Sequence, residues 1–178
     1  MSERTMEILY SPWRSRYVQE ADRETKAESI VCPLCAYAQA PEHDDDKNFI
    51  LVRLHYTYVL LNLYPYNGGH VMVVPYKHVS NLTDLTPEER AEMTEATTHM
   101  IDVIKEVLKP NGFNIGMNIG GKAAGGSIPE HIHMHVLPRW SGDTGFLPVL
   151  ADTKPISQNL VDTYRKLKKY LRSDYLKH

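Results

Sequence analysis

The sequence predicts an α+β fold: an antiparallel β-sheet of about five strands, one long central helix and a C-terminal helix. Short runs of β-branched, aromatic and apolar residues, separated by turn residues, predict the strands. A long segment with apolar residues at spacings of three and four predicts the central helix, and a second such segment near the C-terminus predicts the last helix.

The first three predicted strands follow one another along the chain and form an antiparallel meander. They cover residues 49–52, 56–62 and 70–75. The last two are joined by Tyr64-Pro65-Tyr66-Asn67-Gly68-Gly69, in which proline fixes φ and glycine permits positive φ. The third strand is almost wholly apolar, so we expect it to be buried on both faces.

A long helix is predicted to begin at Thr86. Thr86 can cap the helix, Pro87 suits the first helical position, and Glu89 completes a capping box. Apolar residues then recur at spacings of three and four over Met93–Val107, and Pro110 ends the helix.

The remaining elements follow the helix in order. We expect a strand over residues 113–118, a glycine-rich loop over 120–127 and a strand through the histidines at 131–136. A closing amphipathic helix carries Leu160, Tyr164, Leu167 and Leu171. The predicted domains are an N-terminal arm (1–30), a principal domain (31–150) and a C-terminal helix (151–178) packed on it.

Composition excludes several classes of function. A formal net charge of −2 for 178 residues gives no reason to expect a nucleic-acid or membrane partner. No apolar run approaches the length of a transmembrane helix, and the N-terminus lacks the apolar core of a secretion signal. We therefore expect a cytoplasmic protein.

His131, His133 and His135 recur at period two. On a strand they would share one face, with adjacent rings ~6–7 Å apart. They could be metal ligands, a nucleophile with an assisting neighbour, or a polar face without chemistry. A cupin-type metal site would need a glutamate soon after the pair, and Val136–Trp140 offers none.

The glycine-rich loop before the histidines favours the nucleophile. With Asn118 and Ser127 it presents backbone N–H groups and short polar side chains, which suit phosphate oxygens. An imidazole with an unperturbed pKa of ~6.5 is largely neutral at pH 7 and can attack phosphorus. Together these features indicate phosphoryl or nucleotidyl transfer.

The segment His131–Val136 resembles the His-φ-His-φ-His-φ signature of the histidine triad (HIT) superfamily, where φ is apolar. The resemblance extends to Leu61–His70 and to Pro138–Asp143. It is greatest to the fragile-histidine-triad branch and, within it, to prokaryotic diadenosine tetraphosphate phosphorylases.

The resemblance implies that His135 attacks the α-phosphate of a dinucleoside polyphosphate and forms a nucleotidyl-histidine intermediate. His133 would hydrogen-bond the phosphate and help to protonate the leaving group, and inorganic phosphate or water would resolve the intermediate. The residues implied in substrate binding are Asn62 for the ribose, Asn118, Gly126 and Ser127 for the phosphates, and Trp140, which would stack on adenine or pack against a partner subunit. The family also implies a homodimer.

The glycine-rich loop departs from the eukaryotic fragile-histidine-triad pattern. Gly126-Ser127 stands where a glutamine-containing segment is expected, and one extra residue precedes His131. Besides a phosphorylase, two alternatives stay open. One is a hydrolase of dinucleoside polyphosphates or nucleoside phosphoramidates, and the other is a zinc-stapled nucleotide-binding regulatory protein.

Cys32 and Cys35 could be a redox pair, a buried structural pair or half of a zinc site. A redox motif normally opens a helix within a βαβ unit, which the flanking sequence does not show. His78 and His131 are available to complete a closed Cys₂His₂ structural site. Several bacterial histidine triad proteins resemble this arrangement. Such a site would attach the N-terminal segment to the sheet and take no part in the chemistry.

Overall fold

The computed structural model describes residues 32–120, 124, 126–143 and 159–175. The chain divides into two compact units, one of Val31–Trp140 with Ile156–His178, the other of Met1–Ile30 with Ser141–Pro155. All the described helices and strands belong to the first of these units. The predicted N-terminal arm lies outside the described residues, and the predicted domain boundaries stay predictions.

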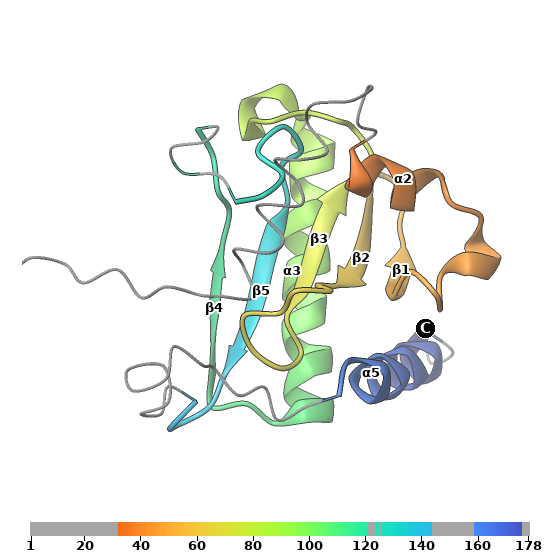
Figure 1. Ribbon diagram of the computed structural model, residues 1–178, viewed down its shortest axis with the longest axis vertical. Helices are drawn as coiled ribbons and strands as arrows, with labels where there is room; N and C mark the ends of the chain where they lie inside the picture. Colours follow the sequence, from red (N-terminus) through yellow and green to blue (C-terminus); the bar gives the residue numbers. More distant parts are fainter. Residues whose placement is uncertain (1–31, 121–123, 125, 144–158, 176–178) are drawn as a thin grey trace, which may run out of the picture. The chain divides into compact units, whose positions relative to one another are not determined.

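A five-stranded antiparallel sheet with strand order β1-β2-β3-β5-β4 forms the centre of this unit (Figure 1). This confirms the α+β prediction, including the meander of the first three strands. Every residue of β2 and β3 is buried, as expected for the third predicted strand. The strands are β1 (Ile50–Arg53), β2 (Thr57–Leu61), β3 (Val71–Pro75), β4 (Gly112–Gly116) and β5 (Met134–Arg139).

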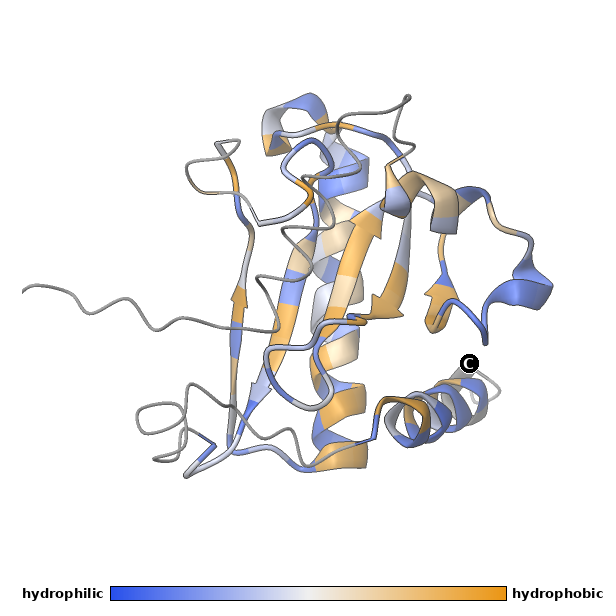
Figure 2. Cartoon of the chain, viewed as in Figure 1, coloured by the Kyte–Doolittle hydropathy of each residue, from blue (hydrophilic) through white to orange (hydrophobic). Residues whose placement is uncertain are grey.

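The long helix α3 (Pro87–Leu108) covers one face of the sheet. It begins as predicted, because Glu89 N donates to Thr86 Oγ1 and Thr86 N donates to the Glu89 carboxylate. Its buried side chains, including Met100 and Ile104, pack against alternate residues of β2 and β3. Figure 2 shows that β2 and β3 are coloured mostly as hydrophobic residues.

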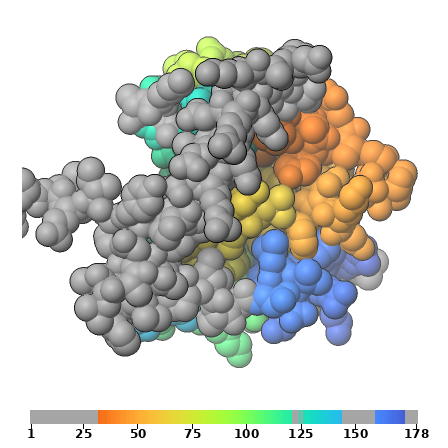
Figure 3. Space-filling view, in the orientation of Figure 1, coloured from red at the N-terminus to blue at the C-terminus, as the bar shows by residue number. Residues whose placement is uncertain are grey.

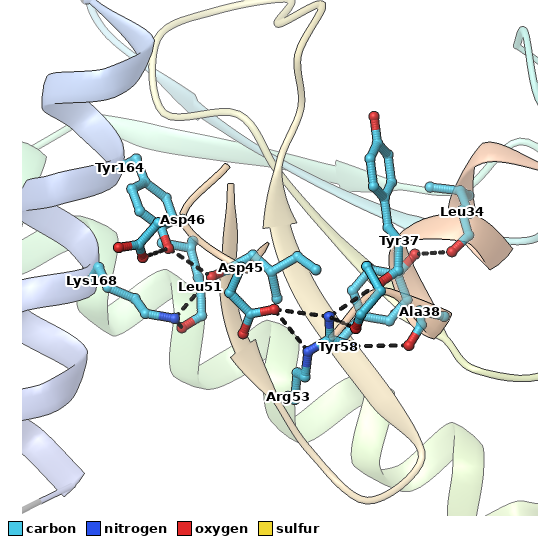
Figure 4. Close-up of polar contacts among 12 residues, drawn as sticks. Leu34, Tyr37, Ala38, Asp45, Asp46, Leu51, Arg53, Tyr58, Tyr164 and Lys168 are labelled. Carbon is cyan, nitrogen blue, oxygen red and sulfur yellow. Dashed lines mark hydrogen bonds and ion pairs between the residues drawn. The ribbon is translucent and has the colours of Figure 1, made fainter. Parts of the chain in front are cut away.

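The C-terminal helix α5 (Leu160–Tyr175) packs on α3 and on the edge strand β1. Tyr164 Oη donates to Asp46 Oδ1 at 2.7 Å and to the Ile50 carbonyl at 3.0 Å. Lys168 Nζ lies 2.9 Å from the carbonyl oxygens of both Ile50 and Leu51 (Figure 4). In the space-filling view the surface of α5 adjoins that of the segment before β1 (Figure 3).

The other face of the sheet carries a short helix, α2 (Pro33–Gln39), that was not expected. Tyr58 and Leu60 alternate with the α3-facing residues of β2 and pack with Leu34 on this face. Arg53 donates to three carbonyls at the end of α2 and pairs with Asp45 (Figure 4). Seven residues are too few to show helical periodicity, so the sequence carried no signal for α2.

Strand β5 begins at Met134, so the expectation that all three histidines lie on one strand is wrong. The neighbouring strand β3 ends at Pro75, which has no N–H to continue the ladder. The Pro75 carbonyl instead accepts a bond from His131 Nε2, and Ile132 N donates to the Val79 carbonyl. Two short 3₁₀ helices, η1 (Glu42–Asp44) and η2 (Leu82–Asp84), complete the described elements.

Among the described residues, no helix has both the length and the apolar character that crossing a bilayer requires.

Candidate active site and metal centre

His135 lies on β5 between two strands, opposite Met72 of β3 and Gly116 of β4. His70 directly precedes β3, and its ring centroid is 5.1 Å from that of His135. The turn that delivers His70 is attached to β5, because Asn67 Nδ2 donates to the Pro138 carbonyl at 3.1 Å.

Gly69 allows this turn to approach the core closely. Its φ is +73°, and a Cβ there would lie 2.5 Å from Leu108 Cδ1. Both observations favour glycine, in agreement with the predicted turn chemistry.

The hydrogen bonds of His70 determine which of its nitrogens carries the proton. Its Nδ1 accepts from the backbone N–H of Tyr66 at 3.1 Å, and a backbone amide can only donate. The neutral ring is therefore protonated on Nε2, which lies 3.0 Å from His135 Nδ1. His135 Nδ1 must accept, which leaves the proton of neutral His135 on Nε2.

Burial, with a smaller contribution from the neighbouring His135 and His133, lowers the pKa of His70 to about 3. His70 is fully buried and so stays neutral at physiological pH. The tautomers of His70 and His135 are consequently fixed by a chain of hydrogen bonds that starts at the Tyr66 amide.

His133 has the opposite tautomer. Its Nδ1 lies 2.8 Å from the backbone carbonyl oxygen of His131, which can only accept. The Nε2 of neutral His133 therefore carries a lone pair. The His133 and His135 rings meet edge to face with centroids 4.7 Å apart, closer than the separation expected along an ideal strand. Two neighbouring imidazoles thus present one lone pair and one N–H.

The contact between His70 and His135 was missed from the sequence. The two residues are 65 positions apart, and only the pairing of β3 with β5 brings them together. No local pattern around His70 signals this contact.

The other predicted substrate-binding residues fall into separate groups. Asn62 Nδ2 lies 3.3 Å from His70 Nδ1, so Asn62 is beside the histidine network. Asn118 contacts the glycine loop, since a Cβ at Gly126 would lie 3.6 Å from its Nδ2. Ser127 is exposed, and Trp140 is half-buried immediately after β5. Gly116 of β4 pairs with His135, and Asn118 follows Gly116 by two residues, so Asn118 lies near the same end of β5 as His135.

Cys32, Cys35, His78 and His131 form one cluster, as the sequence analysis predicted, with all four ligand atoms within 4.8 Å of one another. His131 Nδ1 lies 3.4 Å from each sulfur and 3.3 Å from His78 Nδ1. The Cys35 sulfur lies 3.2 Å from His78 Nδ1. Cys32 is the N-cap of α2 and Cys35 lies one turn later, so both sulfurs face the same side.

These distances fit a tetrahedral metal. With Zn–N of about 2.0–2.1 Å and Zn–S of about 2.3 Å, ligand atoms should be about 3.3–3.8 Å apart. His131 donates its other ring N–H to the Pro75 carbonyl at 2.9 Å, the partner that metal-binding histidines usually have. Burial raises the pKa of Cys32, so a buried thiolate there needs a cation beside it. The residues present therefore suit a closed Cys₂His₂ site.

Comparison with known proteins agrees with this geometry. The family model described as "HIT domain" matches residues 44–142. An "AP-4-A phosphorylase" of Mycobacterium tuberculosis is 44% identical over 162 residues, covering 91% of this chain and 83% of that protein. A "Bis(5'-nucleosyl)-tetraphosphatase [asymmetrical]" of Schizosaccharomyces pombe is 34% identical over 94 residues, covering 53% of this chain and 50% of that protein.

Among solved structures, a zinc-bound histidine triad family protein from Mycobacterium smegmatis superposes with a TM-score of 0.66. It is 27% identical in sequence, and the match covers 85% of this chain and all of that one.

Proposed function

The chain belongs to the HIT family, and on this basis we propose that it cleaves dinucleoside polyphosphates such as diadenosine tetraphosphate, with inorganic phosphate as the acceptor. The mycobacterial phosphorylase supports phosphate as acceptor because the similarity covers most of both chains. The Schizosaccharomyces relative, a tetraphosphatase, supports water as the alternative.

We propose that His133, rather than His135, is the nucleophile. The observation that carries this proposal is the 2.8 Å contact between His133 Nδ1 and the His131 carbonyl, because it leaves a lone pair on His133 Nε2. Nε2 of His135 carries the proton in its neutral form, so this nitrogen has no lone pair with which to attack phosphorus. These contacts favour exchanging the two roles that the family resemblance suggested from the sequence.

In the proposed first step, His133 Nε2 forms a bond to the α-phosphorus while the bond from that phosphorus to the bridging oxygen breaks. His135 Nε2–H donates to the phosphate group and stabilises its developing charge. With diadenosine tetraphosphate the leaving group is ATP. An oxygen of inorganic phosphate then attacks the nucleotidyl-histidine, which releases ADP and restores the free imidazole.

The substrate-binding residues stay proposals that the geometry supports to different degrees. Asn62 is beside the histidine network and could bind a ribose hydroxyl. The Asn118 side chain lies next to Gly126, and Ser127 follows Gly126 in the sequence, so these three residues could hold the polyphosphate. Trp140 is half-buried, which suits either stacking on adenine or packing against a partner subunit.

We propose that the four-residue cluster holds a structural Zn²⁺. Zinc would supply no open coordination position there, because four protein ligands complete its tetrahedron. The structural neighbour described as zinc-bound supports this choice of metal. The cytoplasmic location expected from the sequence stays a prediction.

We also propose a homodimer formed through β4. This strand ends the sheet, and its residues Asn114, Ile115 and Gly116 are exposed in the part of the chain that the structure describes. An exposed edge strand with an apolar side chain is a ready site for pairing with a second copy.

Phosphorus NMR of diadenosine tetraphosphate incubated with the protein tests the reaction. We expect ADP and ATP to appear only when inorganic phosphate is present. Formation of AMP and ATP in the absence of phosphate would show that the protein is a hydrolase rather than a phosphorylase. No product under either condition, with nucleotide binding retained, would support the regulatory protein instead.

A further inference from the structure

We infer that His131 is a positioning residue for His133 as well as a metal ligand, so that occupancy of the metal cluster sets the orientation of the catalytic ring. The inference rests on the proposed role of His133 as nucleophile. It adds to that function a coupling between the metal cluster and the active site, which the sequence predicted to be independent.

The His131 side chain is held from both sides of its ring. On one side Nε2 donates to the Pro75 carbonyl, at the end of β3. On the other side Nδ1 faces three ligand atoms, those of Cys32, Cys35 and His78, at 3.3–3.4 Å. The residue is fully buried, so solvent does not compete for either nitrogen.

The backbone of His131 is not held by the sheet, because β5 begins three residues later. It is held by the segment that carries another metal ligand: Ile132 N donates at 2.7 Å to the carbonyl of Val79, which follows His78. The direction of the His131 carbonyl therefore depends on the arrangement of the metal ligands.

That carbonyl is the acceptor for His133 Nδ1–H. As metal ligands the two cysteines are thiolates and the two histidines present lone pairs, and at the sulfur–nitrogen and nitrogen–nitrogen distances of 3.2–3.4 Å these groups repel one another unless a cation lies between them. When the cation is removed, His78 and His131 separate and the His131 carbonyl moves with its side chain. The bond to His133 Nδ1 then lengthens, and the ring loses the contact that fixes its tautomer and keeps Nε2 available.

The direct test is NMR of the full chain with ¹⁵N-labelled histidine. Long-range correlations between ring nitrogens and carbon-bound protons report which nitrogen of His133 carries the proton. We expect the Nδ1–H form in the zinc-loaded protein, loss or marked shift of its Nδ1–H signal on chelation, and recovery when zinc is returned. Unchanged His133 signals after complete loss of zinc would overturn the inference.

A second metal keeps the test decisive if chelation unfolds the chain. Exchange of zinc for the larger Cd²⁺ retains the four ligands but moves them apart. We expect the His133 Nδ1–H resonance to shift on this exchange, while resonances of α5 stay in place. A resonance that does not respond to the exchange would contradict the coupling.

Kinetics separate positioning from general stability. For Cys35→Ser at low zinc we expect kcat to fall about 10-fold with KM changed less than about 2-fold, and excess zinc to restore kcat. The control is Leu167→Ala, which truncates a buried α5 side chain and should lower stability while kcat at a temperature where it is folded stays unchanged. Equal losses of kcat in both variants would show a merely structural role.

The outcomes distinguish failure of this inference from failure of the proposed function. If the His133 ring signals do not change when zinc is removed, and the His133→Asn variant is inactive, then the coupling is wrong but the proposed nucleophile stands. Full activity of His133→Asn removes the nucleophile and, with it, the basis of the coupling.

Discussion

His70, His133 and His135 carry the same side chain in three different hydrogen-bond environments. A carbonyl partner at Nδ1 leaves His133 with a lone pair at Nε2. The Tyr66 amide, acting through His70, leaves His135 with a proton at Nε2. The complementary roles that we propose for His133 and His135 at phosphorus therefore depend on which backbone group begins each chain of hydrogen bonds.

The buried neutral state of His70 makes stability depend on pH. Its folded pKa is lowered to about 3, whereas the unfolded chain takes up the proton near ~6.5. The contribution is therefore fully present above pH ~6.5 and is lost progressively as pH falls toward the folded value.

Between pH 6.5 and pH 5, we expect the unfolding free energy of the wild type to fall by about 2 kcal/mol more than that of a variant with a residue that does not titrate at position 70. Urea unfolding of the wild type and of His70→Gln across this range measures the difference, since glutamine can keep a hydrogen bond and does not titrate. Parallel pH dependence of the two proteins would show that His70 is not buried in its neutral form.

At the scale of helices and strands, elements with a strong periodic pattern were predictable. The capping box at Thr86 and the apolar stripe that follows it identified α3, and alternation identified β2 and β3. The start of β5 was not predictable, because it depends on where β3 ends in space. Helix α2 is too short for a periodic pattern. It is held by hydrogen bonds from Arg53 and by the packing of Leu34 against Tyr58 and Leu60.

Helix α5 is attached to the edge strand β1 by polar bonds as well as by its apolar face. Lys168 donates to two β1 carbonyls, and Tyr164 donates to one of them and to Asp46. Burial and the Asp46 carboxylate raise the pKa of Tyr164, so its hydroxyl remains a donor. The helix thereby covers the edge strand β1 and bonds its carbonyls, which limits pairing of β1 with other chains.

We expect Lys168→Met to lower the unfolding free energy by about 1–2 kcal/mol, because the stem still packs but two bonds from a charged donor are lost. The matched control is Lys169→Met, at an exposed position of the same helix, which should change stability little. Thermal unfolding of both variants gives the comparison. Equal effects at the two positions would contradict the role of the Lys168 contacts.

The proposed zinc site includes both cysteines at the start of α2, so the proposal predicts that this helix depends on the metal. We expect about one zinc per chain in the wild type, and loss of zinc together with a lower Tm in Cys32→Ser. His43→Ala, which removes an exposed histidine outside the cluster, should retain the metal. Elemental analysis and thermal unfolding measure both properties. Unchanged metal content and stability in Cys32→Ser would refute the site.

On the scale of the whole molecule, the sequence predicted which residues form the sites better than it predicted the hydrogen bonds those residues make. Cys32 and His131 are 99 positions apart, yet ligand type and number were enough to group them. The roles of His133 and His135 were not accessible, because each tautomer depends on a backbone group that folding brings into place. The family signature indicated the class of substrate and reaction, and the hydrogen bonds then supported the proposed roles of its residues.

The proposed homodimer is also a property of the whole molecule. We expect sedimentation of the wild type to give a dimer at micromolar concentration and Ile115→Lys, which charges the exposed β4 position, to give a monomer. Lys169→Met should sediment like the wild type. A monomeric wild type, or an Ile115→Lys variant that remains dimeric, would remove β4 as the interface.

The central claim is that His133 carries the nucleotide during turnover. Rapid mixing with diadenosine tetraphosphate without phosphate, quenching in alkali to preserve the phosphorus–nitrogen bond, and peptide mapping by mass spectrometry locate the adduct directly. We predict adenylyl on His133 in the wild type, the same adduct formed more slowly in His135→Asn, and none in His133→Asn. An adduct on His135, or one that persists in His133→Asn, would contradict the account.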